Sequence, residues 1–144
     1  MSMEKPGRRD AELVLRVYEL RRDAVMRESR SAMNSKFWPR TFEDIGAVLK
    51  PDHPLNAAYR QVSSYWEMVY GMVKHGIVNA EYFLESNGEG LFLFAKVQPF
   101  LAQLRQEYSP RAFRNAEWVS RESSEGRAFF ELFAARVKKT LESR

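Results

Sequence analysis

The sequence predicts an all-α protein, a compact bundle of about six or seven helices with no sheet. Through most of the chain, apolar residues recur at steps of three and four, as they do on one face of an amphipathic helix. No stretch shows the period-two alternation between hairpin turns that is typical of strands.

The composition is that of one folded domain. The 144 residues are 44% hydrophobic and 13% aromatic, which excludes intrinsic disorder. The absence of cysteine excludes disulfides, thiolate metal sites and cysteine nucleophiles. We expect a flexible basic tail at residues 1–9 and a single helical domain at 10–144, located in the cytoplasm. No apolar run approaches the roughly 20 residues of a membrane-spanning helix.

The first third of the chain predicts two helices. The first extends from Asp10, a capping residue, to about Asn34, and Asp23 within it pairs with the arginine four residues later. The second begins at Thr41 and is ended by Pro51, which cannot continue a helix.

The longest helical pattern extends from Pro54 to Gly76 and predicts the central helix. Asp52 is its expected N-cap, Pro54 suits its first turn, and Gly76 suits a left-handed stop. Its apolar stripe contains Leu55, Ala58, Tyr59, Val62, Tyr65, Trp66, Val69, Met72 and Val73.

Two further helices follow. Asn79 is the expected cap of a short helix over 80–85, and residues 91–107 form a strongly apolar helix. Pro99 lies inside the second and cannot donate a hydrogen bond to the carbonyl of Ala95. We therefore expect a kink or a division at Pro99.

The C-terminal part predicts two more helices. Ser109 and Pro110 suit the opening of a helix that continues to Val119. The last helix begins near Ser123 or Ser124.

The middle of the chain resembles a known family. The run Tyr65-Trp66-Glu67, the segment MVKHGIVNAEYF at 72–83, a glycine-containing turn and a Pro99 helix ending in Leu104-Arg105 are similar to the domain-of-unknown-function 4760 family of small bacterial proteins. The similarity covers roughly residues 40–120. It implies an all-helical bundle and no assigned activity. Proteins of that family often carry an N-terminal membrane helix, and we expect none here.

Catalytic and metal-binding motifs are absent from the sequence. His53 and His75 have no partner at zinc-ligand spacing, and neither a G-x-S-x-G elbow nor a phosphate-binding loop occurs. The sequence favours a protein without catalytic activity, cofactor or metal. We expect Glu67 to form a salt bridge with Arg105 on another helix.

The first functional hypothesis is an interaction or regulatory module that binds a protein partner or forms a homodimer. The candidate interface lies on the last helix, where Phe129, Phe130, Phe133 and Arg136 make a broad apolar face with a cation. The first helix offers a second such surface.

The second hypothesis is a small-molecule binder. Its candidate pocket lies where Pro99 frees the carbonyl of Ala95, beside Tyr65, Trp66 and Tyr70.

A third hypothesis is a nucleic-acid binder, because the order of helix, tight turn and central helix is similar to a helix-turn-helix. The start of the central helix offers only Asn56 before Arg60, and the net charge is a modest +4, so a nucleic-acid partner is disfavoured.

Overall fold

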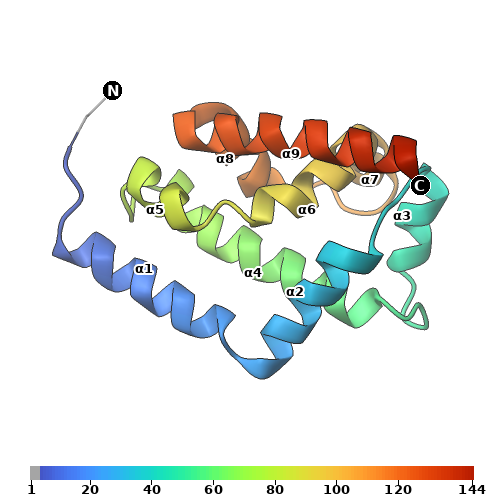
Figure 1. Cartoon of the computed structure of the whole chain (residues 1–144), viewed down its shortest axis with the longest axis horizontal. Coiled ribbons are helices and arrows are strands. Elements are labelled where there is room, and N and C mark those ends of the chain that lie inside the picture. The colour runs from blue at the N-terminus through green and yellow to red at the C-terminus, as the bar shows by residue number, and fades with distance from the viewer. Residues whose placement is uncertain (1–3) are drawn as a thin grey trace.

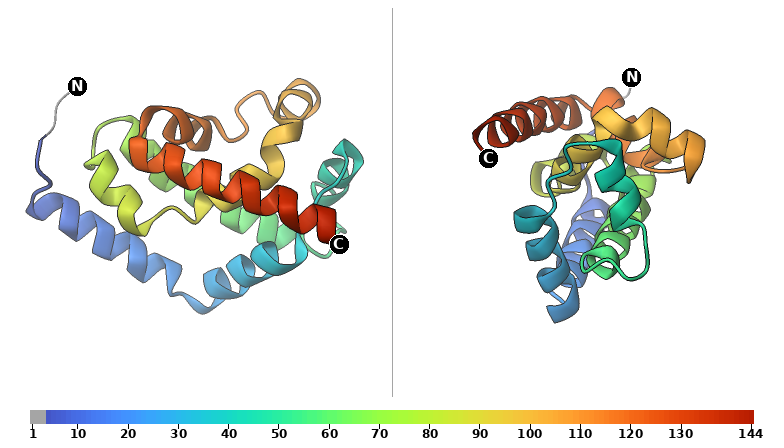
Figure 2. Two further views of the ribbon diagram at one scale, coloured as in Figure 1. Left: turned by 45° about the horizontal axis from the view of Figure 1, so that its top comes forward. Right: turned by 90° about the vertical axis from the view of Figure 1, so that its right-hand side faces the viewer.

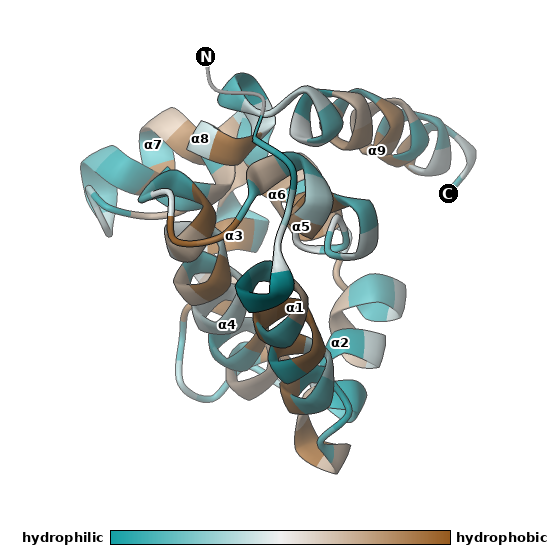
Figure 3. Ribbon diagram, turned by 90° about the vertical axis from the view of Figure 1, so that its left-hand side faces the viewer, coloured by the Kyte–Doolittle hydropathy of each residue, from teal (hydrophilic) through white to brown (hydrophobic). Residues whose placement is uncertain are grey.

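In the computed structural model, the described residues 4–144 form nine α-helices and one 3₁₀ turn, with no strand in that range (Figure 1). The prediction of an all-α fold is therefore confirmed. None of these helices is long and apolar enough to span a membrane, and Figure 3 shows hydrophilic and hydrophobic residues mixed along them. The elements are α1 (Arg8–Arg21), α2 (Ala24–Lys36), α3 (Phe42–Val48), α4 (Asn56–Lys74), α5 (Ala80–Ser86), α6 (Gly90–Val97), η1 (Gln98–Phe100), α7 (Leu101–Glu107), α8 (Arg114–Glu122) and α9 (Ser124–Ser143).

The segment predicted as one helix from Asp10 to Asn34 is divided into α1 and α2, which meet at an angle (Figure 1). The carboxylate of Asp23 accepts hydrogen bonds from the backbone N–H groups of Val25 at 3.0 Å and Met26 at 3.2 Å. The prediction of a continuous helix is wrong because the short aspartate side chain caps α2 and does not pair within a longer helix.

α4 is the central helix, as predicted, and it packs chiefly against α2 and α8. It begins at Asn56, later than predicted, with Leu55 at its N-cap and no capping contribution from Asp52. The side chain of Asn56 instead donates 2.9 Å to the carbonyl of Val48. Gly76 follows the helix with a φ of +71°, which confirms the left-handed stop.

Pro99 divides the apolar segment, as expected. α6 ends at Val97, the 3₁₀ turn η1 contains the proline, and α7 resumes at Leu101. The missing N–H and the bulk of the ring account for the break.

The opening of α8 differs from the prediction. Ser109 and Pro110 begin no helix, and the chain runs as turns until α8 starts at Arg114. The N-cap is Phe113, which has a φ of +57° and is the one non-glycine residue with a positive φ in residues 4–144. Its buried ring packs between Tyr59 at 6.3 Å and Phe94 at 6.0 Å, which compensates a backbone conformation that ordinarily disfavours bulky residues.

α9 lies on the outer side of the molecule over α6 and α8 (Figure 2). Ser123 ends α8 and also caps α9, its hydroxyl accepting 3.0 Å from the N–H of Gly126. The two helices meet without a spacer. They lie so close together that a side chain on Gly126 would collide with the carbonyl of Val119. The predicted start of the last helix is confirmed.

Lys96 on α6 is buried, with only 2% of its surface exposed. Its Nζ donates to the carbonyls of Met33 at 2.9 Å and Asn34 at 3.2 Å in the last turns of α2. The same nitrogen lies 3.9 Å from the ring centroid of Trp38 and 4.5 Å from that of Phe92. Burial, with a smaller contribution from the charge of Arg144, lowers the pKa of Lys96 to about 7.

Candidate functional site

The four residues of the pocket predicted beside Pro99 all lie in the core. Tyr65, Trp66, Tyr70 and Ala95 are each at most 8% exposed. The hydroxyl of Tyr65 donates 2.7 Å to the carbonyl of Val17 on α1, and that of Tyr70 donates 2.8 Å to the carbonyl of Asn87. These tyrosines attach α1 and the α5–α6 turn to α4, and neither lines the two cavities described below.

The predicted interface residues are divided between the core side and the surface. Phe130 faces inward and packs 5.5 Å from the ring of Phe94. Phe129, Phe133 and Arg136 border a groove of about 460 Å³ between α9 and the α5–α6 turn. The α9 groove is lined by Asn34, Glu85, Ser86, Gly88, Glu89, Phe92, Phe129, Phe133 and Arg136.

Three aromatic rings form the apolar part of the α9 groove. Phe129 and Phe133 stack with centroids 5.7 Å apart, and Phe92 meets Phe133 edge-on at 5.3 Å. The guanidinium of Arg136 lies 5.4 Å over the ring of Phe133. The groove therefore presents a preformed aromatic surface with a cation at its edge.

The two acids on the opposite side of the groove differ in whether their charge is paired. Glu89 is held by Arg30 through two 2.7 Å hydrogen bonds, so its charge is compensated within the fold. Glu85 is exposed and has no ion-pair partner within residues 4–144. Leu132, one residue before Phe133, is 53% exposed on the outward side of α9.

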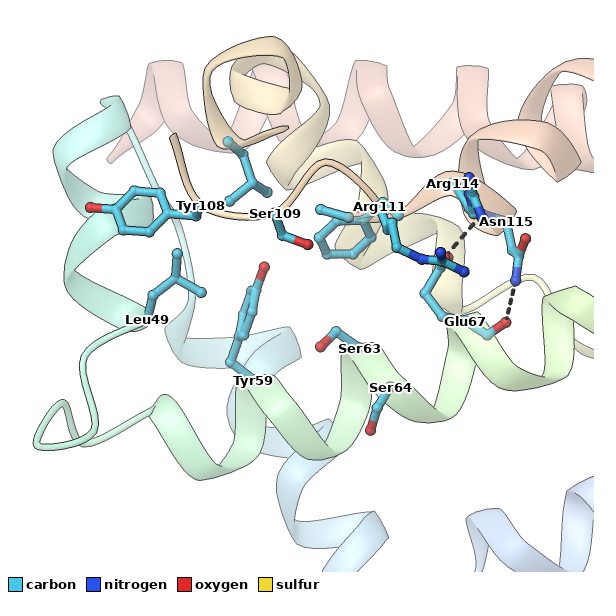
Figure 4. A pocket seen from close by; sticks show the side chains of 13 residues that line it. Leu49, Tyr59, Ser63, Ser64, Glu67, Tyr108, Ser109, Arg111, Arg114 and Asn115 are labelled. Atoms are coloured by element: carbon cyan, nitrogen blue, oxygen red, sulfur yellow. Dashed lines mark hydrogen bonds between the residues drawn. The ribbon is translucent and has the colours of Figure 1, made fainter. Parts of the chain in front are cut away.

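A second cavity, of about 370 Å³, lies between α4 and the chain that arches over it from Tyr108 to Asn115 (Figure 4). Sequence reasoning missed this cavity. The stretch SPRAFRN at 109–115 did carry a signal, since it combines a proline with two arginines and has little apolar periodicity. The α4–α8 cavity is lined by Leu49, Tyr59, Ser63, Ser64, Glu67, Leu104, Tyr108, Ser109, Arg111, Ala112, Phe113, Arg114 and Asn115.

Glu67 attaches the arching segment to α4. Its carboxylate accepts hydrogen bonds from the backbone N–H groups of Asn115 at 3.0 Å and Ala116 at 2.8 Å, in the first turn of α8. The amide of Asn115 also donates 2.9 Å to the backbone carbonyl of Glu67. An acid at a helix N-terminus is stabilised by the N–H groups and the dipole. Burial nevertheless raises the pKa of Glu67, and the α8 N–H groups only partly oppose it.

The predicted salt bridge between Glu67 and Arg105 is wrong. Arg105 pairs with Glu117 at 3.0 Å and donates to the carbonyl of Ala112 at 3.0 Å. The carboxylate of Glu67 accepts hydrogen bonds from the backbone of α8 instead. The sequence does not show these donors, because they are backbone N–H groups and not side chains.

The fold defines an all-α protein, and both cavities lie between its helices. Within residues 4–144 no group of His, Asp and Glu side chains is arranged to hold a metal ion. The chain belongs to the DUF4760 family, a domain of unknown function, whose sequence model matches residues 8–123. No curated protein and no solved structure matches the chain. The match includes the α4–α8 cavity and ends immediately before α9.

Proposed function

We propose that the protein is an interaction module without catalytic activity, and that the α9 face, which consists of the α9 groove and the neighbouring Leu132, binds a second copy of the chain. The observation that supports this proposal is self-complementarity. The α9 groove offers an aromatic hollow and a cation, and the same face carries an exposed apolar side chain and an unpaired acid. A two-fold interface requires one surface to supply both halves of every contact.

The apolar contact joins Leu132 to the groove. On a helix, Leu132 lies beside Phe129 and Arg136, which are three and four residues away. Related by a two-fold axis, Leu132 of each copy reaches the Phe129–Phe133 rings of the other. Burial of a leucine side chain against preformed aromatic rings stabilises association by about 1.5–3 kcal/mol before the entropic cost of docking.

The polar contact joins Arg136 to Glu85 of the partner subunit. Within residues 4–144 neither side chain has an ion-pair partner of opposite charge. Both border the same groove, so a two-fold relation brings each toward the other without a rearrangement of the fold. The pair sets the register of the two copies more than it adds affinity.

The test compares two single substitutions by sedimentation velocity over a range of protein concentrations. Leu132→Lys places a charge in the proposed interface, and Met68→Lys is the matched control on α4, where Met68 is 58% exposed. We expect the wild type and Met68→Lys to dimerise and Leu132→Lys to remain monomeric. A monomeric wild type, or equal dissociation of both variants, would refute the proposal.

A charge exchange tests the register of the dimer. Arg136→Glu places two acids together and should weaken dimerisation, and adding Glu85→Arg should restore it. A double variant no better than Arg136→Glu would show that these two residues do not meet.

A further inference from the structure

We propose that the α4–α8 cavity binds a small organic carboxylate that has an apolar body and a second polar group at its far end. This site is independent of the α9 face, because the two cavities share no lining residue. With a volume of about 370 Å³, the α4–α8 cavity falls in the range of small-molecule sites.

Tyr59 supplies a polar group that faces the cavity and that the described part of the fold leaves unpaired. The residue is 6% exposed, and its hydroxyl has no hydrogen-bond partner within residues 4–144. Its ring is fixed by edge contacts to Phe37 at 5.8 Å and Phe113 at 6.3 Å. In Figure 4 the hydroxyl points into the cavity, toward the side of Ser109. The hydroxyl is open to the cavity, so it is available to a polar group of a ligand.

Burial also fixes what the Tyr59 hydroxyl can do. It raises the pKa of Tyr59 well above its ordinary value, so the group stays protonated at neutral pH. A protonated hydroxyl donates one hydrogen bond and accepts others. It can therefore pair with a hydroxyl or carbonyl group on the ligand.

Two arginines lie at the other end of the α4–α8 cavity. Figure 4 shows Arg111 and Arg114 on the α8 side, away from Tyr59. Both are exposed, and neither has an ion-pair partner or a side-chain hydrogen bond within residues 4–144. With Glu67 as the single lining acid, two positive charges and one negative leave a formal charge of +1.

Glu67 decides which anion suits this end. Phosphate sites at a helix start use the free backbone N–H groups of the first turn. Here the N–H groups of Asn115 and Ala116 are already bonded to Glu67. The planar guanidinium groups of Arg111 and Arg114 remain; they pair with carboxylate and phosphate alike, and the lining charge of +1 is balanced by a singly charged carboxylate.

Part of the lining of the α4–α8 cavity is apolar. Leu104, Ala112 and the ring of Phe113 supply apolar side chains to it. Leu49 lies beyond Tyr59, on the side away from the arginines (Figure 4). A flat or short apolar body fits against these side chains, with the carboxylate at the arginines and the polar group at Tyr59.

The probes are 4-hydroxybenzoate, benzoate and 4-hydroxybenzamide, titrated into the full chain by isothermal calorimetry. The first carries all three features, the second lacks the far polar group, and the third replaces the carboxylate by a neutral amide. We expect 4-hydroxybenzoate to bind about 3- to 10-fold tighter than benzoate, from one hydrogen bond. We expect 4-hydroxybenzamide to bind at least about tenfold more weakly than 4-hydroxybenzoate.

Two variants assign these differences to residues. Tyr59→Phe keeps the ring contacts and should remove the advantage of 4-hydroxybenzoate over benzoate without abolishing benzoate binding. Arg111→Gln/Arg114→Gln should remove the preference for carboxylate over amide. The matched control, Arg9→Gln/Arg27→Gln, changes the net charge equally at exposed helix positions outside the cavity and should bind like the wild type.

Three results would overturn the proposal. They are no binding by any of the three probes, equal affinity for acid and amide, and equal loss of binding in the Arg9/Arg27 control. If Tyr59→Phe still prefers 4-hydroxybenzoate to benzoate, the ligand hydroxyl contacts another residue. That result would refute the assigned orientation.

Discussion

Replacement of Lys96 by methionine tests whether the native protein holds this amine in its neutral form. Lys96 is buried against Trp38 and Phe92, and its Nζ donates to two carbonyls at the end of α2. A neutral amine can make both of those bonds. Methionine retains the unbranched shape and removes the titration.

The magnitude follows from the pKa difference between the folded and unfolded chains. The pKa is about 7 in the fold and 10.5 when the side chain is exposed. Between these values the unfolded chain binds the additional proton, so the free energy of unfolding rises with pH. From pH 7 to pH 9 the calculated gain is about 2 kcal/mol, and most of the remainder follows by pH 10.5. The contribution falls away as the pH drops through 7 and is absent about one unit lower.

The assay is urea denaturation of the wild type and Lys96→Met between pH 6.5 and pH 9.5. The difference between the two proteins isolates Lys96, because all other titrating groups are shared. We expect the wild type to gain about 2 kcal/mol relative to the variant between pH 7 and 9. Parallel profiles would refute the reasoning. They would mean that the carbonyls and aromatic rings hold the ammonium form against the effect of burial.

Two further substitutions test how α8 is held. Gly126→Ala should lower the free energy of unfolding by more than about 2 kcal/mol, because its methyl group collides with the carbonyl of Val119; an unchanged melting temperature would contradict the close contact between α8 and α9. Glu67→Gln should cost about 1–2 kcal/mol in urea denaturation, because each carboxylate oxygen accepts from a different N–H of α8 and the amide places an NH2 donor where one oxygen was. A stability equal to the wild type would show that this anchor is dispensable.

Regular apolar spacing explains why α4 could be predicted from the sequence. Val62, Tyr65, Trp66, Val69 and Val73 follow one stripe, and all five are buried. The division at Pro99 was predictable for a different reason, since proline lacks the backbone donor wherever it occurs. Both signals are local to the segment that they describe.

Capping and backbone contacts explain what could not be predicted. An aspartate such as Asp23 can form a stabilising ion pair within a helix, and it can equally cap the start of a new helix. Only the direction in which the chain continues shows which of the two roles Asp23 has. The α4–α8 cavity depends on Phe113 in a left-handed conformation and on Glu67 bonded to N–H groups 48 and 49 residues away. Neither feature has a side-chain pattern, because the backbone donor is the same in every residue except proline.

Because no spacer separates α8 from α9 at Ser123, a change in the tilt of α8 moves α9 with it. α9 has 20 residues and is therefore about 30 Å long. A tilt of only about 5° in α8, if the elbow stays rigid, displaces the far end of α9 by roughly 2.5 Å. The far end of α9 is itself bonded, because Arg40 donates to the carbonyls of Leu141 at 2.9 Å and Arg144 at 3.1 Å. A displacement there therefore reaches the chain between α2 and α3.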